Sequence, residues 1–357
     1  MEAFRILLFP FAVFYGLLTK VRNILFDIRV LPSEKFKIPV IAVGNLIAGG
    51  SGKTPLVEYI VRLAGNTVTM ASLSRGYKRK TKGYRLAGEN ETVETLGDEP
   101  LQYHHKFPNL KVAVCESRRE GIGRLIKEIA GLDAVILDDA FQHRYVVPEL
   151  SILVTDYFKL FTQDWLLPFG KLREHISGRK RADIIVVTKT PRIFSPIVRK
   201  QLIEEIKPFP GQLVCFSYIN YLDFKPVYRN SCDFTSKIEN VYSIILLTGI
   251  GNPGPMEEYL RRFCTDLELM EFPDHHVFTP NDLLMLKDRY TTLPTKRKII
   301  VTTEKDAKRL QNAESEAILS ALPIFYTPIE FEFHPADKLL FDKAVKKVVT
   351  PGVNLKS

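Results

Sequence analysis

A glycine-rich loop near residue 50 joins an expected strand at Pro39–Val43 to an expected helix at Lys53–Leu63. Glycines let several backbone N–H groups turn toward phosphate oxygens, and the helix N-terminus adds its positive end. In such a loop Lys53 would bridge the outer phosphates of a nucleotide, and the Thr54 hydroxyl would bind Mg²⁺. Ile47 stands where the usual pattern has glycine, which indicates a variant P-loop. The expected nucleotide-binding residues are Gly49, Gly50, Ser51, Gly52, Lys53 and Thr54.

Short apolar runs alternate with helical patterns over residues 32–222. The other expected strands are Val68–Leu73, Leu110–Val114, Ala134–Leu137, Leu150–Val154 and Ile184–Thr188, and the other expected helices are Glu99–His104 and Arg118–Ile129. Continuous apolar strands that alternate with helices predict a mostly parallel sheet covered on both faces.

A smaller set of the same kind occupies residues 223–357. Its expected strands are Ser243–Thr248, Leu267–Phe272, Lys298–Thr302 and Ile324–Tyr326, and its expected helices are Pro255–Phe263, Pro280–Tyr290 and Ala336–Val349. The periodicity breaks around residues 218–230, where polar and aromatic residues mix. The 357 residues therefore predict an N-terminal helical segment (1–31), a P-loop α/β domain (32–222) and a smaller α/β domain (223–357).

Two pairs of acidic residues are candidates for metal binding and proton transfer. Asp138 and Asp139 end the apolar strand Ala134–Leu137, which is the arrangement in which a carboxylate at a strand tip helps to hold Mg²⁺. Gln142 and His143 follow at once and would line the same site.

The second pair, Asp98 and Glu99, lies in a turn before a helix, where carboxylates often serve only as caps. In the C-terminal part, Asp274 precedes His275 and His276. A carboxylate that orients an imidazole suits general acid–base catalysis, and an ordinary surface histidine is the alternative.

The N-terminus is unusually apolar. Residues 6–19 form an apolar run that is too short for a membrane span, and an amphipathic stretch with Lys20, Arg22 and Asn23 off its apolar face follows. Such a helix can lie in a membrane interface or pack on the protein's own core. The net charge of +9 favours anionic partners. Because RNA-binding aromatic motifs and zinc-finger spacings are missing from the sequence, we do not expect nucleic acid among them.

Taken in order, these motifs resemble the tetraacyldisaccharide 4′-kinases of lipid A synthesis, over almost the whole chain. The residues that carry the resemblance are Gly44-Asn45, the loop 49–55, Ser74-Arg75-Gly76-Tyr77, Gly97-Asp98-Glu99-Pro100, Leu137-Asp138-Asp139-Ala140-Phe141-Gln142-His143, Leu172-Arg173-Glu174, Arg181-Ala182-Asp183, Thr248-Gly249-Ile250-Gly251-Asn252-Pro253, Phe272-Pro273-Asp274-His275-His276 and Thr303-Glu304-Lys305-Asp306. His175 stands where the family often has proline after Leu-Arg-Glu, and residues 115–119 lack an acidic–basic pair expected there.

The resemblance implies two α/β domains with the active site between them, and transfer of the γ-phosphoryl group of ATP to the 4′-hydroxyl of an acylated glucosamine disaccharide 1-phosphate. It implies Asp98 as the catalytic acid, paired with His275 or, failing that, His276, with Lys53 on the phosphates. It also implies attachment of the N-terminal helix to the cytoplasmic face of the bacterial inner membrane. The implied Mg²⁺ ligands are Thr54, Glu99, Asp138 and Asp139, and the candidate substrate contacts are Asn45, Arg75, Gln142, His143 and Glu174.

Two rival functions use the same loop. A nucleotide-driven switch is one, because Val187-Thr188-Lys189-Thr190 is similar to a guanine-reading motif, although it lacks the aspartate of that motif. A membrane adaptor that no longer catalyses is the other, and the intact Lys53, Thr54, Asp98 and Asp138 argue against it. The sequence leaves the oligomeric state open.

Overall fold

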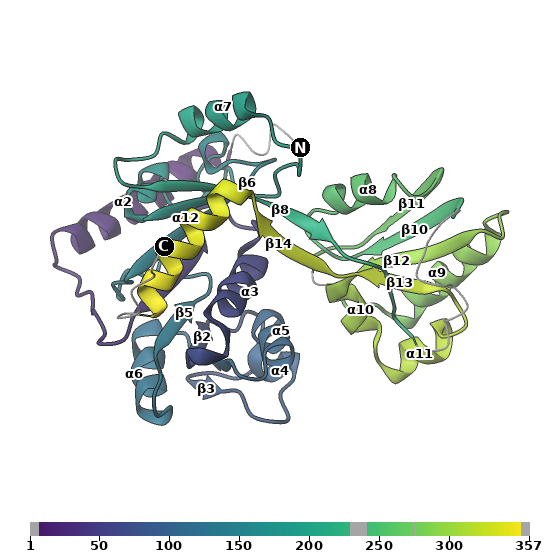
Figure 1. Ribbon diagram of the computed structural model, residues 1–357, viewed down its shortest axis with the longest axis horizontal. Helices are drawn as coiled ribbons and strands as arrows, with labels where there is room; N and C mark the ends of the chain where they lie inside the picture. The colour runs from purple at the N-terminus through teal and green to yellow at the C-terminus, as the bar shows by residue number, and fades with distance from the viewer. Residues whose placement is uncertain (1–6, 229–240, 275, 351–357) are drawn as a thin grey trace. The chain divides into compact units, whose positions relative to one another are not determined.

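The computed structural model describes residues 7–228, 241–274 and 276–350 (Figure 1). Its internal contacts divide the chain into two compact units. Unit 1 holds the described residues up to Tyr218 together with those from Phe331 onward, and unit 2 holds the described residues of Ile219–Glu330.

Unit 1 is built on a nine-stranded sheet in the order β14-β8-β7-β6-β1-β5-β2-β4-β3. The strands are β1 Val40–Asn45, β2 Met70–Ser74, β3 Arg85–Leu86, β4 Lys111–Val114, β5 Ala134–Leu137, β6 Leu150–Asp156, β7 Ile184–Thr188, β8 Leu213–Tyr221 and β14 Ile329–Phe333. The seven strands from β8 to β4 pair in parallel, and β3 is antiparallel to β4. Every residue of β1 is buried, as expected for a central parallel strand covered on both faces.

The helices of unit 1 follow or flank these strands. They are α2 Phe9–Asp27, α3 Lys53–Ala64, α4 Val93–Leu96, α5 Asp98–Lys106, α6 Arg118–Glu128, α7 Pro196–Ile206 and α12 Pro335–Val349, with 3₁₀ turns η1 Gly65–Thr67, η2 Phe161–Gln163 and η3 Ile176–Arg181. The six strands expected in this part of the sequence are confirmed within two residues at each end, whereas β3, β8, β14 and α7 were not predicted.

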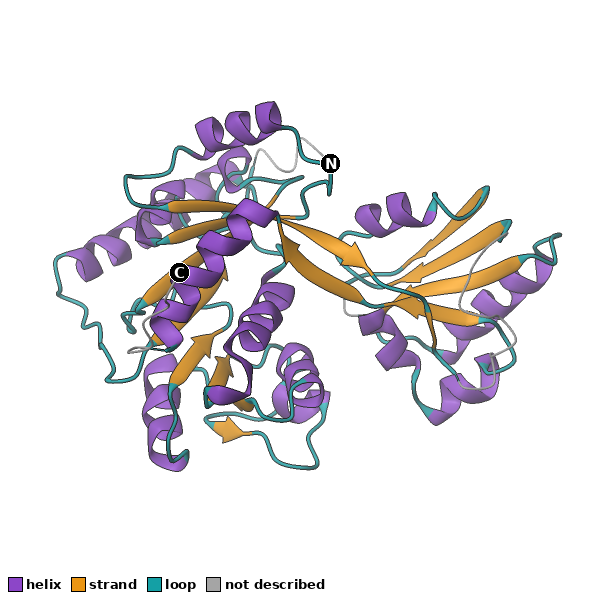
Figure 2. Cartoon of the chain, viewed as in Figure 1, coloured by secondary structure: helices purple, strands orange, loops and turns teal. Residues whose placement is uncertain are grey.

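Unit 2 is a five-stranded sheet in the order β11-β10-β12-β13-β9, with helices beside it (Figure 2). Its elements are β9 Lys225–Pro226, β10 Ser243–Thr248, α8 Gly254–Leu260, β11 Asp266–Glu271, α9 Pro280–Thr292, β12 Lys298–Thr303, α10 Glu304–Leu310, α11 Ala313–Leu319 and β13 Ile324–Thr327. All pairs are parallel except β13 with β9. The expected fold class, a large parallel sheet plus a smaller α/β part, is confirmed.

The last helix, α12, belongs to unit 1. The sequence predicts it within the smaller domain, residues 223–357, so the division of the chain differs from the expected one. Tyr59 of α3 donates a 2.6 Å hydrogen bond to Asp342 of α12, and Arg199 of α7 forms two hydrogen bonds to Asp337. Phe341 is fully buried and stacks on Phe333 of β14. These partners lie far away in the sequence, so periodicity alone could not assign α12 to a unit.

The N-terminal helix α2 buries one side and exposes the other. Ala12 and Phe26 are buried, whereas apolar residues such as Phe14 and Leu17 are more than half exposed. Among the described residues, no helix is both long and apolar enough to cross a membrane.

We expect Phe341→Ala to lower the free energy of unfolding of unit 1 by about 3–5 kcal/mol, because it removes a fully buried aromatic ring and leaves a cavity. Leu339→Ala, on the exposed side of the same helix, should change it by less than about 0.5 kcal/mol. Urea unfolding of both variants would test this, and equal effects would mean that α12 is not packed as described.

Candidate active site

The candidate phosphate-binding loop, residues 46–52, leads from the central strand β1 into α3. Gly52, the residue before α3, has a φ of +84°, and a Cβ at this position would lie 3.2 Å from the Thr188 hydroxyl oxygen. Only glycine adopts this positive φ and leaves room for the Thr188 hydroxyl without strain. Among the described residues, no side chain caps α3, so its first N–H groups face the loop in the manner of an anion site.

The second half of the loop is held by side chains at the ends of β1 and β7, the two strands that flank β6. The Asn45 amide donates a 2.8 Å hydrogen bond to the Ser51 hydroxyl, and the Thr188 hydroxyl donates one of the same length to the Ser51 carbonyl. Lys189 donates to the Gly50 carbonyl at 2.7 Å. Thr188 and Lys189, which suggested a guanine site in the sequence, therefore brace the loop backbone instead.

The first half of the loop pairs with a distant segment. The N–H of Ala48 donates to the Lys171 carbonyl, the N–H of Arg173 donates to the Leu46 carbonyl, both at 2.8 Å, and Ile47 bridges to Leu172. This pairing explains why Ile47 can replace the usual glycine, because here the backbone is extended and paired to another segment.

Lys53 and Asp139 face each other across the loop. The Lys53 amine lies 3.4 Å from one Asp139 oxygen, and Arg173 forms hydrogen bonds of 2.9 and 2.8 Å to the two oxygens of the same carboxylate. Burial alone would raise the pKa of Asp139, but the two cations outweigh it and hold the pKa below its usual range. Asp139 is therefore charged and holds Lys53 at the loop.

Asp138, Glu99 and Thr54 form a second group. Asp138 is buried and accepts a 2.9 Å hydrogen bond from Tyr103 at one oxygen, while its other oxygen is buried without a hydrogen-bond partner. The Thr54 hydroxyl donates to Glu99 at 2.9 Å. Burial, and then the Glu99 charge, raise the pKa of Asp138 well above its usual range.

This group fits a divalent cation. The unpaired Asp138 oxygen and the Thr54 hydroxyl are oxygen ligands for a metal, and a cation would relieve the cost of burying Asp138 close to the half-buried Glu99 carboxylate. The described residues contain no cluster of three His, Cys, Asp or Glu side chains arranged to hold a metal. Mg²⁺ at nucleotide sites uses few protein ligands and takes the remainder from phosphate and water. The lack of a three-residue cluster among the described residues is therefore compatible with a Mg²⁺ site at Thr54 and Asp138.

Asp98 is the first residue of α5. Gly97 precedes it with a φ of +93°, and a Cβ there would lie 2.9 Å from the Tyr77 carbonyl oxygen. This close approach brings the segment that carries Arg75 against the start of α5. Gly97 is the N-cap residue of α5, and Asp98 and Glu99 both lie in its first turn, so the helix-start alternative stays open beside the catalytic one.

The histidine motif lies in unit 2. His275 falls outside the described residues. His276 lies 2.9 Å from Asp282 through its Nε2 atom and stacks on Phe272. The pairing of Asp98 with a histidine therefore stays a prediction.

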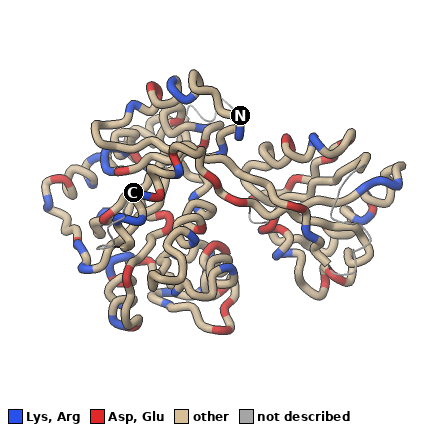
Figure 3. Tube along the Cα trace, viewed as in Figure 1, with Lys and Arg blue, Asp and Glu red and all other residues tan. Residues whose placement is uncertain are grey.

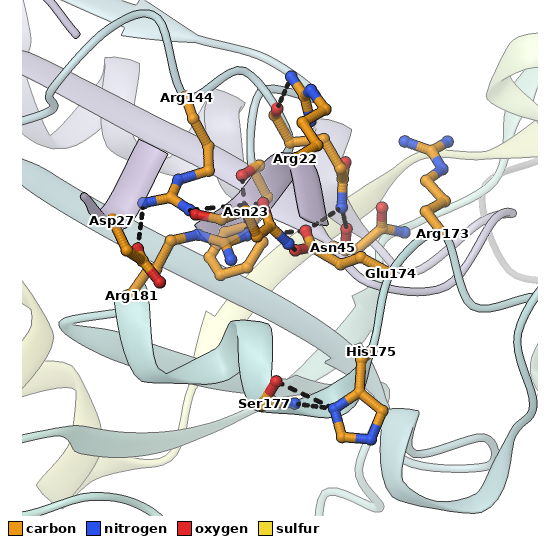
Figure 4. Close-up of polar contacts among 12 residues, drawn as sticks. Arg22, Asn23, Asp27, Asn45, Arg144, Arg173, Glu174, His175, Ser177 and Arg181 are labelled. Carbon is orange, nitrogen blue, oxygen red and sulfur yellow. Dashed lines mark hydrogen bonds and ion pairs between the residues drawn. The ribbon is translucent and has the colours of Figure 1, made fainter. Parts of the chain in front are cut away.

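The five candidate substrate residues fall into different environments. Arg75 is exposed, and His143 is half-buried. Asn45 and Glu174 are buried, and Gln142 links them: its amide donates to the Asn45 carbonyl at 2.8 Å and to Glu174 at 3.1 Å. The close-up in Figure 4 shows Asn45 and Glu174 within one polar network.

Sequence reasoning missed several residues of this site, Arg118 above all. Arg118 is buried, and its guanidinium donates to the backbone carbonyls of Cys115 and Asp138. Burial lowers its pKa to about 10, so it is still charged at neutral pH. Its place at the start of α6, after strand β4 of a parallel sheet, was a usable signal, because such positions face the ligand edge.

Comparison with known proteins agrees with this geometry. The sequence model of one family, described as tetraacyldisaccharide-1-P 4′-kinase, matches residues 4–349. The chain belongs to this family. Among curated relatives, the tetraacyldisaccharide 4′-kinase of Flavobacterium psychrophilum is 42% identical over 99% of this chain and 100% of its own length. The enzyme of the same name from Bacteroides thetaiotaomicron is 42% identical over 89% of this chain and 87% of its own length.

A solved structure shares the fold. The crystal structure of LpxK from Aquifex aeolicus in complex with ATP has a TM-score of 0.70 and 28% identity, and the match covers 97% of this chain and 99% of that one. Family membership identifies the chain as a kinase, a transferase that binds ATP. It also agrees with the resemblance inferred from the ordered motifs.

His143 should make stability depend on pH. Burial, and then the Arg118 charge, lower its pKa from an ordinary 6.5 to about 4. Between these values the unfolded chain holds a proton that the folded protein lacks, so the free energy of unfolding should rise with pH from about 4 to 6.5. We expect His143→Asn to reduce this slope by at most about 1.4 kcal/mol per pH unit. Urea unfolding at several pH values tests it, and an unchanged slope would contradict the assignment.

Proposed function

We propose that this chain transfers the γ-phosphoryl group of ATP to the 4′-hydroxyl of tetraacyldisaccharide 1-phosphate, the reaction named for its family. The observation that carries the proposal is the braced loop, with Lys53 held by Asp139 on one side and Thr54, Glu99 and Asp138 grouped on the other.

In this proposal the protein supplies position and charge. Backbone N–H groups of residues 49–54 and the Lys53 amine bind the β- and γ-phosphates, as in other P-loop proteins. ATP would compete with Asp139 for Lys53, and Arg173 would keep the freed Asp139 carboxylate neutralised. Such fixed charges cost no reorganisation during the reaction, which is how they favour the transition state.

Thr54 and Asp138 would hold Mg²⁺, with Glu99 and Asp139 close enough to contribute directly or through water. When bound, the cation would neutralise charge on the transferred phosphoryl group. Asp98, at the start of α5, would receive the proton of the 4′-hydroxyl. We keep His275 as its orienting partner on the resemblance alone.

We further propose that α2 rests on a lipid surface at the cytoplasmic face of the inner membrane, where an acylated acceptor and ATP can meet. Its outward residues are apolar, with Phe11 and Phe14 each more than 60% exposed. A loop from the core extends this surface, because Phe169 contacts Phe9 and Trp165 edge to face. Figure 3 shows Lys and Arg interspersed with Asp and Glu along the trace, so the apolar surface would supply most of the binding.

We expect Lys53→Ala and Asp98→Ala each to lower turnover at least about 100-fold, the scale for losing a positioned charge or an acid–base group. Lys200→Ala, on the exposed surface of α7, is the matched control and should retain activity. The assay is transfer of labelled γ-phosphate from ATP to tetraacyldisaccharide 1-phosphate in detergent with Mg²⁺. Loss of ATP without labelled lipid would instead support the switch-type NTPase.

Trp165 is the only tryptophan of the chain and is 62% exposed, which makes it a reporter of lipid contact. Its fluorescence should shift to shorter wavelength when vesicles of zwitterionic and acidic phospholipids are added, because an interfacial indole leaves water. Phe14→Glu should weaken the shift, and Leu339→Glu, an exposed position on α12, should not. Vesicle binding that leaves the emission unchanged would remove this loop from the lipid surface.

A further inference from the structure

Beside the buried Ala12 and Phe26, helix α2 turns several polar residues toward the protein, and most of its apolar residues face away from it. Tyr15, Arg22 and Asn23 are partly buried, whereas Leu17 and Val21 between them are exposed. A helix that only anchored the chain would not need these inward polar groups. The inward polar groups of α2 instead contact residues that in turn contact the phosphate-binding loop.

The first connection runs from Tyr15 to Lys53. The Tyr15 hydroxyl donates a 2.7 Å hydrogen bond to the Arg173 carbonyl. The Arg173 guanidinium binds both oxygens of Asp139, and Asp139 holds Lys53. Three contacts thus separate α2 from the lysine expected to bind phosphate.

The second connection runs from Asn23 to Asn45. The Asn23 amide donates to one Glu174 oxygen at 2.9 Å, while Arg181 and Gln142 donate to the other at 2.7 and 3.1 Å (Figure 4). Gln142 also donates to the Asn45 carbonyl at the end of β1. Glu174 is only 3% exposed, so water cannot easily replace a lost donor.

The two connections meet in one segment. Arg173 and Glu174 are adjacent, and residues 171–173 pair through their backbone with residues 46–48 of the loop. A change in the position of α2 would therefore act on the loop backbone and on Lys53 together. Arg144 strengthens the attachment, since it donates to the Asn23 carbonyl at 2.7 Å and to Asp27 at 2.6 Å.

We propose that α2 is a positioning element for the ATP site, with Asn23 and Tyr15 as positioning residues that hold Arg173 and Glu174 against the phosphate-binding loop. The proposal rests on the proposed ATP-dependent function. According to this proposal, the contacts that hold α2 against the protein determine the affinity for ATP, separately from any contact that α2 makes with lipid.

The test uses the full-length chain in detergent without vesicles, so that lipid attachment cannot contribute. Asn23→Ala should raise the Kd for ATP about tenfold, the scale of one hydrogen bond to a buried charge. Asn23→Asp should raise it further, because it faces Glu174 with a like charge. Lys20→Ala, on the exposed side of the same helix, should leave the Kd unchanged.

Three readouts distinguish a positioning role of these residues from a general loss of stability. The rise should appear in the KM for ATP at temperatures well below unfolding. Asn23→Ala should add less in a Glu174→Gln background than in the wild type, because the two residues share one contact. Tyr15→Phe, which removes a single hydroxyl, should raise the Kd for ATP about threefold. Because this change is small, it tests the proposal even if Asn23→Ala fails to fold.

An unchanged Kd in folded Asn23→Ala and Tyr15→Phe, or additive effects with Glu174→Gln, would overturn the proposal. Failure of the wild-type chain to bind ATP would instead refute the proposed function.

Discussion

The parallel pairing of β1 with β5 on one side and β6 on the other is the constraint on which the rest of unit 1 depends. Parallel strands bring their carboxyl ends to one edge, so the loop after β1 lies beside the residues that follow β5, β6 and β7. Asp138 and Asp139 follow β5, and Thr188 and Lys189 lie at the end of β7. In an antiparallel sheet of the same order, Asp138 and Asp139 would lie at the opposite edge from the loop after β1.

Charge then decides what the edge can bind. Asp139 lies between two cations and is held ionised, whereas the adjacent Asp138 is buried near Glu99 and is held toward its neutral form. The site thus pairs a charged carboxylate that keeps Lys53 in place with a carboxyl group whose ionised form needs a cation. Both arrangements suit the binding of a metal-bound polyphosphate, and both follow from which neighbours the fold provides.

Helix α2 links this centre to an apolar surface formed by its own exposed residues. The sequence offered membrane binding and core packing as alternatives, and in the structure the two need not exclude each other: the helix buries Ala12 and Phe26, forms hydrogen bonds to the protein through inward polar groups, and exposes most of its apolar residues. Hydrophobic periodicity detected the outer side. The inner side escaped notice because its partners, Arg173 and Glu174, lie about half the chain away.

The sequence by itself determined the fold class and placed the glycine-rich loop between β1 and α3 and the two aspartates after β5, because each depends on contiguous residues whose spacing matches a local backbone geometry. It also fixed the family, because many short motifs occur in one order. Only the tertiary structure decided that α12 returns to unit 1, that Arg118 is buried beside Asp138, and that Thr188 and Lys189 hold the loop. These features depend on contacts between distant segments, and sequence periodicity records which side of a segment is buried but not what it is buried against.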